Sequence, residues 1–148
     1  MSDGRAIDIR CDITITGEHL FYTELVLVVD DDNEILELAA EILRTSGYDV
    51  LTARNGLEAV TILRSTSRIS ILFTDIQMPN MGGEELAEVA VALWPGIRVI
   101  FTSGCSRPRT DASFVQKPYR AADLLNVLSP HADVPAWNPG PRVDNCAS

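Results

Sequence analysis

The sequence predicts an α/β fold built on a doubly wound, five-stranded parallel sheet. Short apolar runs rich in β-branched residues alternate along the chain with amphipathic segments of helical period, and Gly, Pro, Asp or Asn marks most of the boundaries between them. Alternation of this kind is typical of parallel sheets that helices cover on both faces. With 148 residues and 46% hydrophobic content, the chain can form one domain with a complete core.

Five strands and four helices follow from the apolar pattern. The first helix is expected to begin after a cap at Asp32 or Asn33 and to end before Gly47, and Pro95 with Gly96 ends the third helix. The expected strands span residues 25–29, 49–53, 69–74, 99–102 and 114–116, and the later helices span residues 56–64, 84–94 and 120–128.

The crossover between the last two strands is too short for a regular helix. Only residues 105–113 separate Gly104 from Phe114, and Pro108 lies in the middle of them. A right-handed crossover normally contains a helix of about three turns. The fourth helix of the fold is therefore expected to be missing or reduced to a loop.

Polar residues stand at the carboxyl ends of four predicted strands. The edge formed by such ends is where open α/β sheets bind ligands. Three acids, a lone Asp, a hydroxyl and a Lys would therefore meet in one crevice, and this set suits Mg²⁺ together with a phosphoryl group. The segments are V-V-D-D-D at 28–32, F-T-D-I-Q-M-P at 73–79, F-T-S-G at 101–104 and V-Q-K-P at 115–118.

These four motifs, in this order and spacing, resemble the receiver domain of bacterial two-component response regulators, a flavodoxin-like fold of the CheY type with strand order 2-1-3-4-5. The resemblance covers about residues 25–128. It implies that a sensor histidine kinase or a histidine phosphotransfer protein donates a phosphoryl group to one aspartate, which by motif position is Asp75. The domain would then change its surface and act on a downstream protein that the sequence does not name.

The resemblance also implies a Mg²⁺ site. Asp31 and Asp75 would bind the cation directly, and Gln77 would contribute its backbone carbonyl. Asp30 would bind the cation through water, or would support the direct ligands without binding the cation itself. Bringing these carboxylates together is costly without a cation.

Five further residues match positions of the receiver motifs. Lys117 would pair with Asp75 or its phosphate, and Pro118, which is cis in relatives, would direct the loop that carries it. Ser103 aligns with the hydroxyl that follows the phosphoryl group inward, beside the small residue Gly104. Phe114 takes the place of the aromatic switch residue, where the alternative is an ordinary core side chain.

Composition narrows the function further. The formal net charge of −9, with twelve scattered Lys and Arg residues, argues against a nucleic-acid surface. The longest apolar runs are too short to span a membrane, and the amino terminus lacks a signal-peptide pattern, so a cytoplasmic protein is expected. Cys11, Cys105 and Cys146 are widely spaced, which disfavours structural zinc and a disulfide framework.

The ends of the chain depart from a plain receiver. Residues 24–129 are expected to form the receiver domain, and residues 130–148 are rich in Pro and small polar residues, as is typical of a disordered tail. Residues 1–23 form an extension in which residues 7–16 alternate between apolar and polar types, the pattern of a strand. A flexible leader is the alternative for this segment.

Three functions remain open at this point. The first is a single-domain phosphoacceptor that signals or relays through protein contact and catalyses nothing beyond its own phosphorylation and dephosphorylation. The second is a degenerate receiver that binds proteins independently of phosphorylation. The third is a Mg²⁺-dependent phosphohydrolase, whose usual Asp-x-Asp nucleophile pattern fits Asp30 and Asp32 in spacing but leaves Asp75 unexplained.

Overall fold

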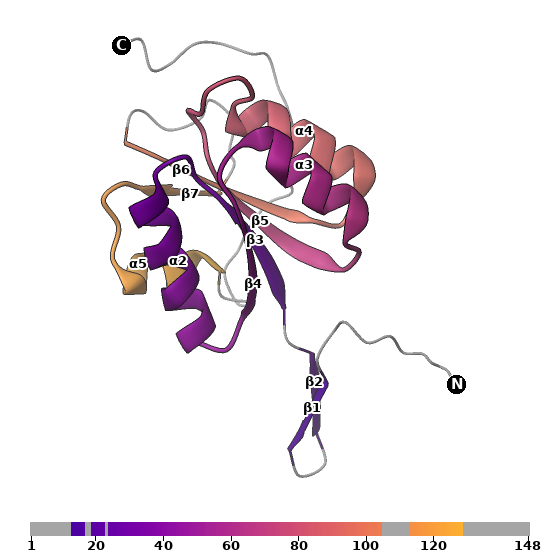
Figure 1. Ribbon diagram of the computed structural model, residues 1–148. Helices are drawn as coiled ribbons and strands as arrows, with labels where there is room; N and C mark the ends of the chain where they lie inside the picture. Colours follow the sequence, from indigo (N-terminus) through magenta and orange to yellow (C-terminus); the bar gives the residue numbers. More distant parts are fainter. Residues whose placement is uncertain (1–12, 17–18, 23, 105–112, 129–148) are drawn as a thin grey trace.

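The computed structural model describes residues 13–16, 19–22, 24–104 and 113–128 of the chain. In this part of the protein, five parallel strands form one sheet in the order β4-β3-β5-β6-β7 (Figure 1). Counted from β3, this order is 2-1-3-4-5, so the predicted fold class is confirmed. The strands are β3 Leu25–Val29, β4 Asp49–Ala53, β5 Ile69–Asp75, β6 Arg98–Ser103 and β7 Ser113–Gln116.

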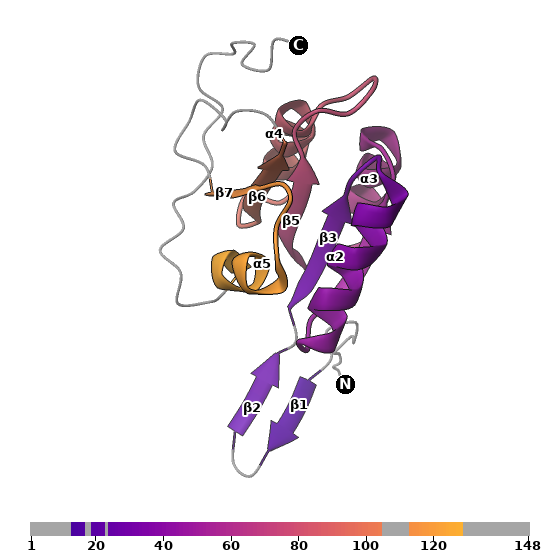
Figure 2. The ribbon, with the colours of Figure 1, turned by 90° about the vertical axis from the view of Figure 1, so that its left-hand side faces the viewer.

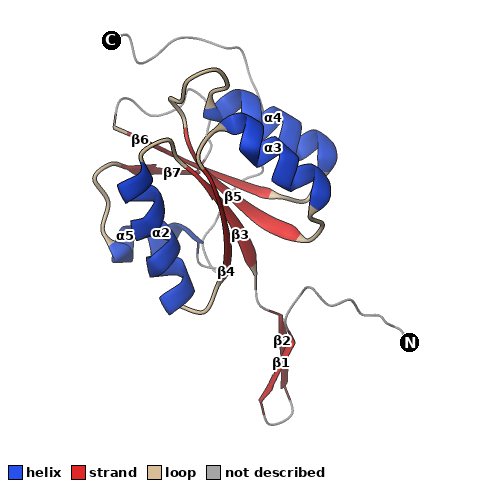
Figure 3. Ribbon diagram, in the orientation of Figure 1, coloured by secondary structure: helices blue, strands red, loops and turns tan. Residues whose placement is uncertain are grey.

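Four helices of the described residues cover the two faces of the sheet. Helices α2 (Asn33–Thr45) and α5 (Ala121–Leu128) lie on one face, and α3 (Gly56–Ser65) and α4 (Gly83–Leu93) lie on the other (Figure 3). Figure 2 shows the molecule turned by 90°, viewed from the side on which α2 and α5 lie. The segment 105–112, where a shortened or missing helix is expected, lies outside the described residues, so that expectation stays a prediction.

Alternate residues of the central strands supply two apolar clusters, one on each face of the sheet. This explains why the strands read as continuous apolar runs, since a parallel strand covered on both faces has no polar side. One cluster, beneath α2 and α5, includes Val26, Val28, Ile71, Phe73, Ile100, Leu43 and Leu124. The other, beneath α3 and α4, includes Leu27, Val29, Leu72, Val99, Phe101, Leu63 and Leu86.

Local capping sets the limits of the first two of these helices. The carboxylate of Asp32 accepts hydrogen bonds from the backbone N–H groups of Glu34 (3.0 Å) and Ile35 (3.4 Å), so Asp32 rather than Asn33 is the N-cap of α2. Gly47 follows the helix with φ 102°, a conformation that glycine adopts without strain. Asn55 caps α3 by accepting from the N–H of Glu58 at 2.8 Å.

The carboxyl end of α5 is held by a side chain from β6 and by one from the turn before β4. Arg98, at the start of β6, donates to the carbonyl oxygens of Val127 (3.2 Å) and Leu128 (3.3 Å). The hydroxyl of Tyr48 also donates to the Leu128 carbonyl at 3.3 Å. A guanidinium suits this position because helix carbonyls at the carboxyl end carry partial negative charge.

A two-stranded antiparallel hairpin precedes the domain and stands apart from its sheet (Figures 1 and 2). Its strands are β1 (Ile13–Thr16) and β2 (His19–Tyr22), with Ile13 opposite Tyr22 and Thr16 opposite His19. Of residues 7–16, whose alternation predicts a strand, only 13–16 are described, and these form β1. The sequence prediction did not include β2, its partner. The tail after residue 128 lies outside the described residues.

Gly83 allows α4 to begin directly against the end of β5. Its N–H donates to the carbonyl oxygen of Ile76 at 2.8 Å, and a Cβ at this position would overlap the carbonyl oxygen of Asp75. Only a residue without a side chain fits this approach. The second Gly of the segment M-P-N-M-G-G therefore fixes the loop that follows Asp75.

We expect Gly83→Ala to lower the free energy of unfolding by about 1–3 kcal/mol, because the added methyl group must displace backbone. Gly96→Ala is the matched control, since a Cβ at Gly96 meets no atom within 4 Å. Urea denaturation of both variants and the wild type measures the effect. Equal losses in the two variants would contradict the assignment of Gly83 as a site of forced close approach.

Candidate functional site

The carboxyl ends of the central strands meet at one edge of the sheet and are tied together by backbone hydrogen bonds. The N–H of Asp30 donates to the carbonyl of Ala53 at 3.2 Å, and the N–H of Lys117 donates to the carbonyl of Ser103 at 3.0 Å. Asp75 is the last residue of β5 and lies opposite Thr102 of β6. The residues that the sequence singled out therefore stand at or directly after the carboxyl ends of four neighbouring strands, β3, β5, β6 and β7.

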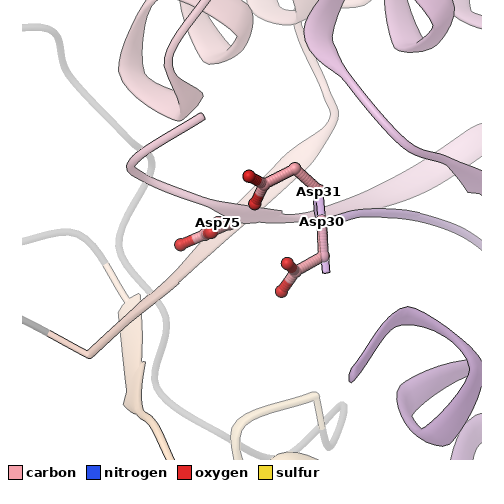
Figure 4. A group of neighbouring side chains, drawn as sticks. All are labelled: Asp30, Asp31 and Asp75. Atoms are coloured by element: carbon pink, nitrogen blue, oxygen red, sulfur yellow. The ribbon is translucent and has the colours of Figure 1, made fainter. Parts of the chain in front are cut away.

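Three carboxylates gather at this edge. Asp30, Asp31 and Asp75 each offer an oxygen, and the three oxygens all lie within 4.8 Å of one another (Figure 4). Asp30 and Asp75 are buried, with 2% and 6% of their surface exposed, whereas Asp31 is exposed to solvent. The site thus combines two carboxylates fixed by the core with one that faces outward.

Lys117 bridges the two buried carboxylates. Its Nζ lies 2.9 Å from Oδ2 of Asp30 and 3.3 Å from Oδ2 of Asp75. The other oxygen of Asp30, Oδ1, accepts a hydrogen bond from the N–H of Asp32 at 2.9 Å. Asp32 therefore caps α2 with its side chain and supports Asp30 with its backbone.

The electrostatics of the site oppose ionisation of Asp75. The pKa of Asp75 is raised from 3.8 to about 6, chiefly by burial. The charges of Asp30 and Asp31 also raise this pKa, and the charge and hydrogen bond of Lys117 partly offset them. Burial alone would lower the pKa of Lys117. The hydrogen bond to Asp30 and the charges of Asp75 and Asp30 outweigh that effect, so the pKa of Lys117 is raised.

This donor set fits a small divalent cation. Carboxylate oxygens are the ligands that Mg²⁺ prefers, and a cation next to Asp75 would offset the crowding of negative charge that raises its pKa. The acidic triad is therefore compatible with the Mg²⁺ site that is typical of receiver domains.

The remaining residues of the sequence prediction lie on or directly after strands β5, β6 and β7. The peptide bond between Lys117 and Pro118 is cis, as the resemblance implied. Ser103 is buried at the end of β6, and a Cβ at the next residue, Gly104, would meet no atom within 4 Å. Gln77 is exposed in the loop after β5. Phe114 is half-buried on β7 and packs against the cluster beneath α3 and α4.

Sequence reasoning did not single out Tyr119. Its ring is buried in the cluster beneath α2 and α5 and meets the ring of Phe73 edge to face, with 5.8 Å between centroids. The available signal was an aromatic residue immediately after the Lys-Pro pair. Gly83 was also missed as an individual residue, although its segment was recognised.

Comparisons with known proteins agree with this geometry. The family model described as response regulator receiver domain matches residues 26–129. The response regulator receiver protein CpdR of Brucella abortus is 34% identical over 112 residues, which covers 70% of this chain and 92% of that protein. A response regulator receiver protein of an Anaeromyxobacter species is 46% identical over 110 residues, covering 74% of this chain but only 43% of that longer protein.

Among solved structures, the complex of CheX, CheY, beryllofluoride and Mg²⁺ from Borrelia burgdorferi matches with a TM-score of 0.65 and 26% identity, covering 71% of this chain and 86% of the matched chain. The fold and the acidic pocket together are those of a receiver domain. The chain belongs to the response regulator receiver domain family.

Receiver domains of this family are generally signalling proteins rather than enzymes, and they interact with histidine kinases and phosphotransfer proteins. The structure adds one finding on the membrane question: among the described residues, every helix is too short or too polar to cross a bilayer.

In the absence of divalent cations, we expect Asp75 to make the protein less stable as the pH rises. Its pKa is raised in the folded state, so its contribution to stability is full below about pH 4 and is lost as the pH passes about 6. The loss in free energy of unfolding is on the order of 2–3 kcal/mol.

Asp75→Asn removes the titrating group and serves as the reference. Urea denaturation in EDTA between pH 4 and pH 8 measures the difference between wild type and variant. The variant is expected to be the more stable protein at pH 7, and pH profiles that run parallel would contradict the argument.

Proposed function

We propose that this protein is a phosphoacceptor receiver in which Asp75 accepts a phosphoryl group from a phosphohistidine donor in a Mg²⁺-dependent reaction. The donor is a sensor histidine kinase or a histidine phosphotransfer protein, and the phosphorylated domain signals or relays by contact with a downstream protein. The observation that carries the proposal is the position of Asp75: it ends a buried strand, pairs with Lys117 at 3.3 Å and shares a pocket with Asp30 and Asp31.

The proposed step is an in-line displacement at phosphorus. An oxygen of the Asp75 carboxylate forms a bond to phosphorus while the bond between phosphorus and the imidazole nitrogen of the donor breaks, and the donor histidine leaves as neutral imidazole after taking up a proton. Positioning and neutralisation of charge account for most catalysis of this reaction. Strand β5 fixes the nucleophile, and the ammonium of Lys117 balances charge on the transferred group.

Asp31 and Asp75 would hold Mg²⁺ directly, with the backbone carbonyl of Gln77. Asp30 would act through water or by supporting the direct ligands. When bound, the cation supplies positive charge beside the phosphoryl oxygens. The exposure of Asp31 and the engagement of Asp30 by Lys117 at 2.9 Å support this division of roles.

Two residues, Ser103 and Phe114, would transmit the change, and Gly104 would keep the site open. The hydroxyl of Ser103 would bind the phosphoryl group, and Gly104 would leave the phosphoryl oxygens accessible. Phe114 has no hydroxyl, so any signal through it would be a change in packing against the cluster beneath α3 and α4. Similarity to the Brucella relative over 92% of that protein supports a single-domain regulator.

Incubation with acetyl phosphate and Mg²⁺, followed by intact-mass measurement, tests the proposed phosphorylation. We expect one phosphate adduct on the wild type and none on Asp75→Asn. Asp32→Asn is the matched control because it makes the same chemical change two residues from Asp30 and preserves a good helix cap. An unmodified but folded wild type would overturn the proposal and favour a phosphorylation-independent binding module. Adducts that persist on Asp75→Asn would place the acceptor elsewhere.

Thermal denaturation with and without Mg²⁺ tests the cation site separately from phosphorylation. At a Mg²⁺ concentration about 100 times the dissociation constant, binding raises the free energy of unfolding by about 2.7 kcal/mol. We expect Asp31→Asn to lose most of this increase because a direct ligand is removed, and Asp32→Asn to retain it. The same response to Mg²⁺ in both variants would exclude Asp31 as a ligand.

A further inference from the structure

Tyr119 carries a buried hydroxyl that has no hydrogen-bond partner among the described residues. The residue is 9% exposed, and its ring is fixed against Phe73 at an interplanar angle of 75°. A buried polar group without a partner costs free energy and is rare in folded proteins, so its retention calls for an explanation. Phe at this position would fill the same space at no such cost.

Tyr119 packs on the face of the sheet that leads to both buried carboxylates. Tyr119 belongs to the same cluster as Val28 of β3 and Phe73 of β5. Asp30, which directly follows β3, and Asp75, which ends β5, each come two positions after one of these residues. Residues two apart on a strand share a face of the sheet. After burial, the charges of Asp30 and Asp75 are what raise the pKa of Tyr119, so the phenol stays protonated and can donate.

Phosphorylation of Asp75 would change the ion pairs that Lys117 forms with the two buried carboxylates. A phosphoryl group brings close to two negative charges and three strong acceptor oxygens, which attract the ammonium away from Asp30. In the structure described here that ammonium is closer to Asp30, at 2.9 Å, than to Asp75, at 3.3 Å. Asp30 is 2% exposed, and its Oδ1 keeps the N–H of Asp32 as a donor at 2.9 Å. The departure of Lys117 leaves the buried Oδ2 without its direct donor, which costs free energy unless another donor takes its place.

We propose that Tyr119 is a positioning residue of the phosphorylated state: its hydroxyl donates a hydrogen bond to the carboxylate of Asp30 when Lys117 moves to the phosphoryl group. This inference rests on the proposed phosphorylation of Asp75. The unphosphorylated domain then carries an unused donor, and the phosphorylated domain satisfies it, so one hydroxyl favours the second state over the first.

The other buried hydroxyl without a partner, Oγ1 of Thr102, does not replace Tyr119 in this role. Thr102 lies on β6, opposite Asp75 of β5. Strand β5 separates β6 from β3, the strand that Asp30 follows. A threonine hydroxyl stays close to its own strand because its side chain is short and stiff at χ1. The longer Tyr119 side chain packs in the same cluster as Val28, two residues before Asp30.

Tyr119→Phe tests the inference because it removes the hydroxyl and keeps the ring. With beryllofluoride and Mg²⁺ as the probe for the phosphorylated state, we expect the apparent affinity of the variant for beryllofluoride to fall roughly tenfold or more, since a hydrogen bond to a charged group is lost. The stability of the protein without the probe is expected to stay the same or rise. Tyr48→Phe is the matched control, because its hydroxyl binds the Leu128 carbonyl at the far end of α5.

Tyrosine labelled with ¹³C at Cζ gives a direct readout of the hydrogen bond. The chain has three tyrosines, and the two Phe variants assign the signals of Tyr48 and Tyr119. We expect the Tyr119 signal to shift on addition of beryllofluoride with Mg²⁺ and the Tyr48 signal to stay in place.

Two results would overturn the inference in distinguishable ways. If the wild type binds beryllofluoride and Tyr119→Phe binds it equally well, with no shift of the Tyr119 signal, the hydroxyl has no role and the proposed function stands. If the folded wild type neither binds beryllofluoride nor accepts phosphate from acetyl phosphate, the proposed function fails and this inference fails with it.

Discussion

The crowding of three carboxylates at one edge of the sheet is the constraint on which the rest of the site depends. Burial and the neighbouring acids raise the pKa of Asp75 to about 6, and a single ammonium, that of Lys117, bridges both buried members of the triad. A pocket with an excess of buried negative charge gains stability when positive charge is added to it. The same property that makes the fold less stable at neutral pH makes the pocket receptive to a divalent cation.

The surrounding backbone keeps this costly arrangement in place. Strand β5 carries Asp75 out of a core that is apolar on both faces, and the carbonyl of Ser103 fixes the N–H of Lys117 at 3.0 Å. Gly83 lets α4 begin against the carbonyl of Asp75. Rigid elements that converge on one point can hold like charges close together, whereas flexible loops would allow the charges to move apart.

The strands of the sheet and the acidic pocket were predictable from sequence because both depend on strong local patterns. Strands such as Leu25–Val29 are buried on both faces and read as unbroken apolar runs. The sequence did not reveal Tyr119, because its environment depends on the ring of Phe73, which is distant in the chain. Nor did it reveal that His19–Tyr22 pairs with Ile13–Thr16, since that short segment carries no clear alternation of its own.

The anchoring of α5 has a mechanical consequence. Arg98 and Tyr48 bind the carbonyls at the carboxyl end of the helix, while its first turn follows the loop that carries Lys117. An element clamped at one end and displaced at the other behaves as a lever. A small shift of the Lys117 loop would therefore reach the surface as a tilt of α5, largest at Ala121 and smallest at Leu128.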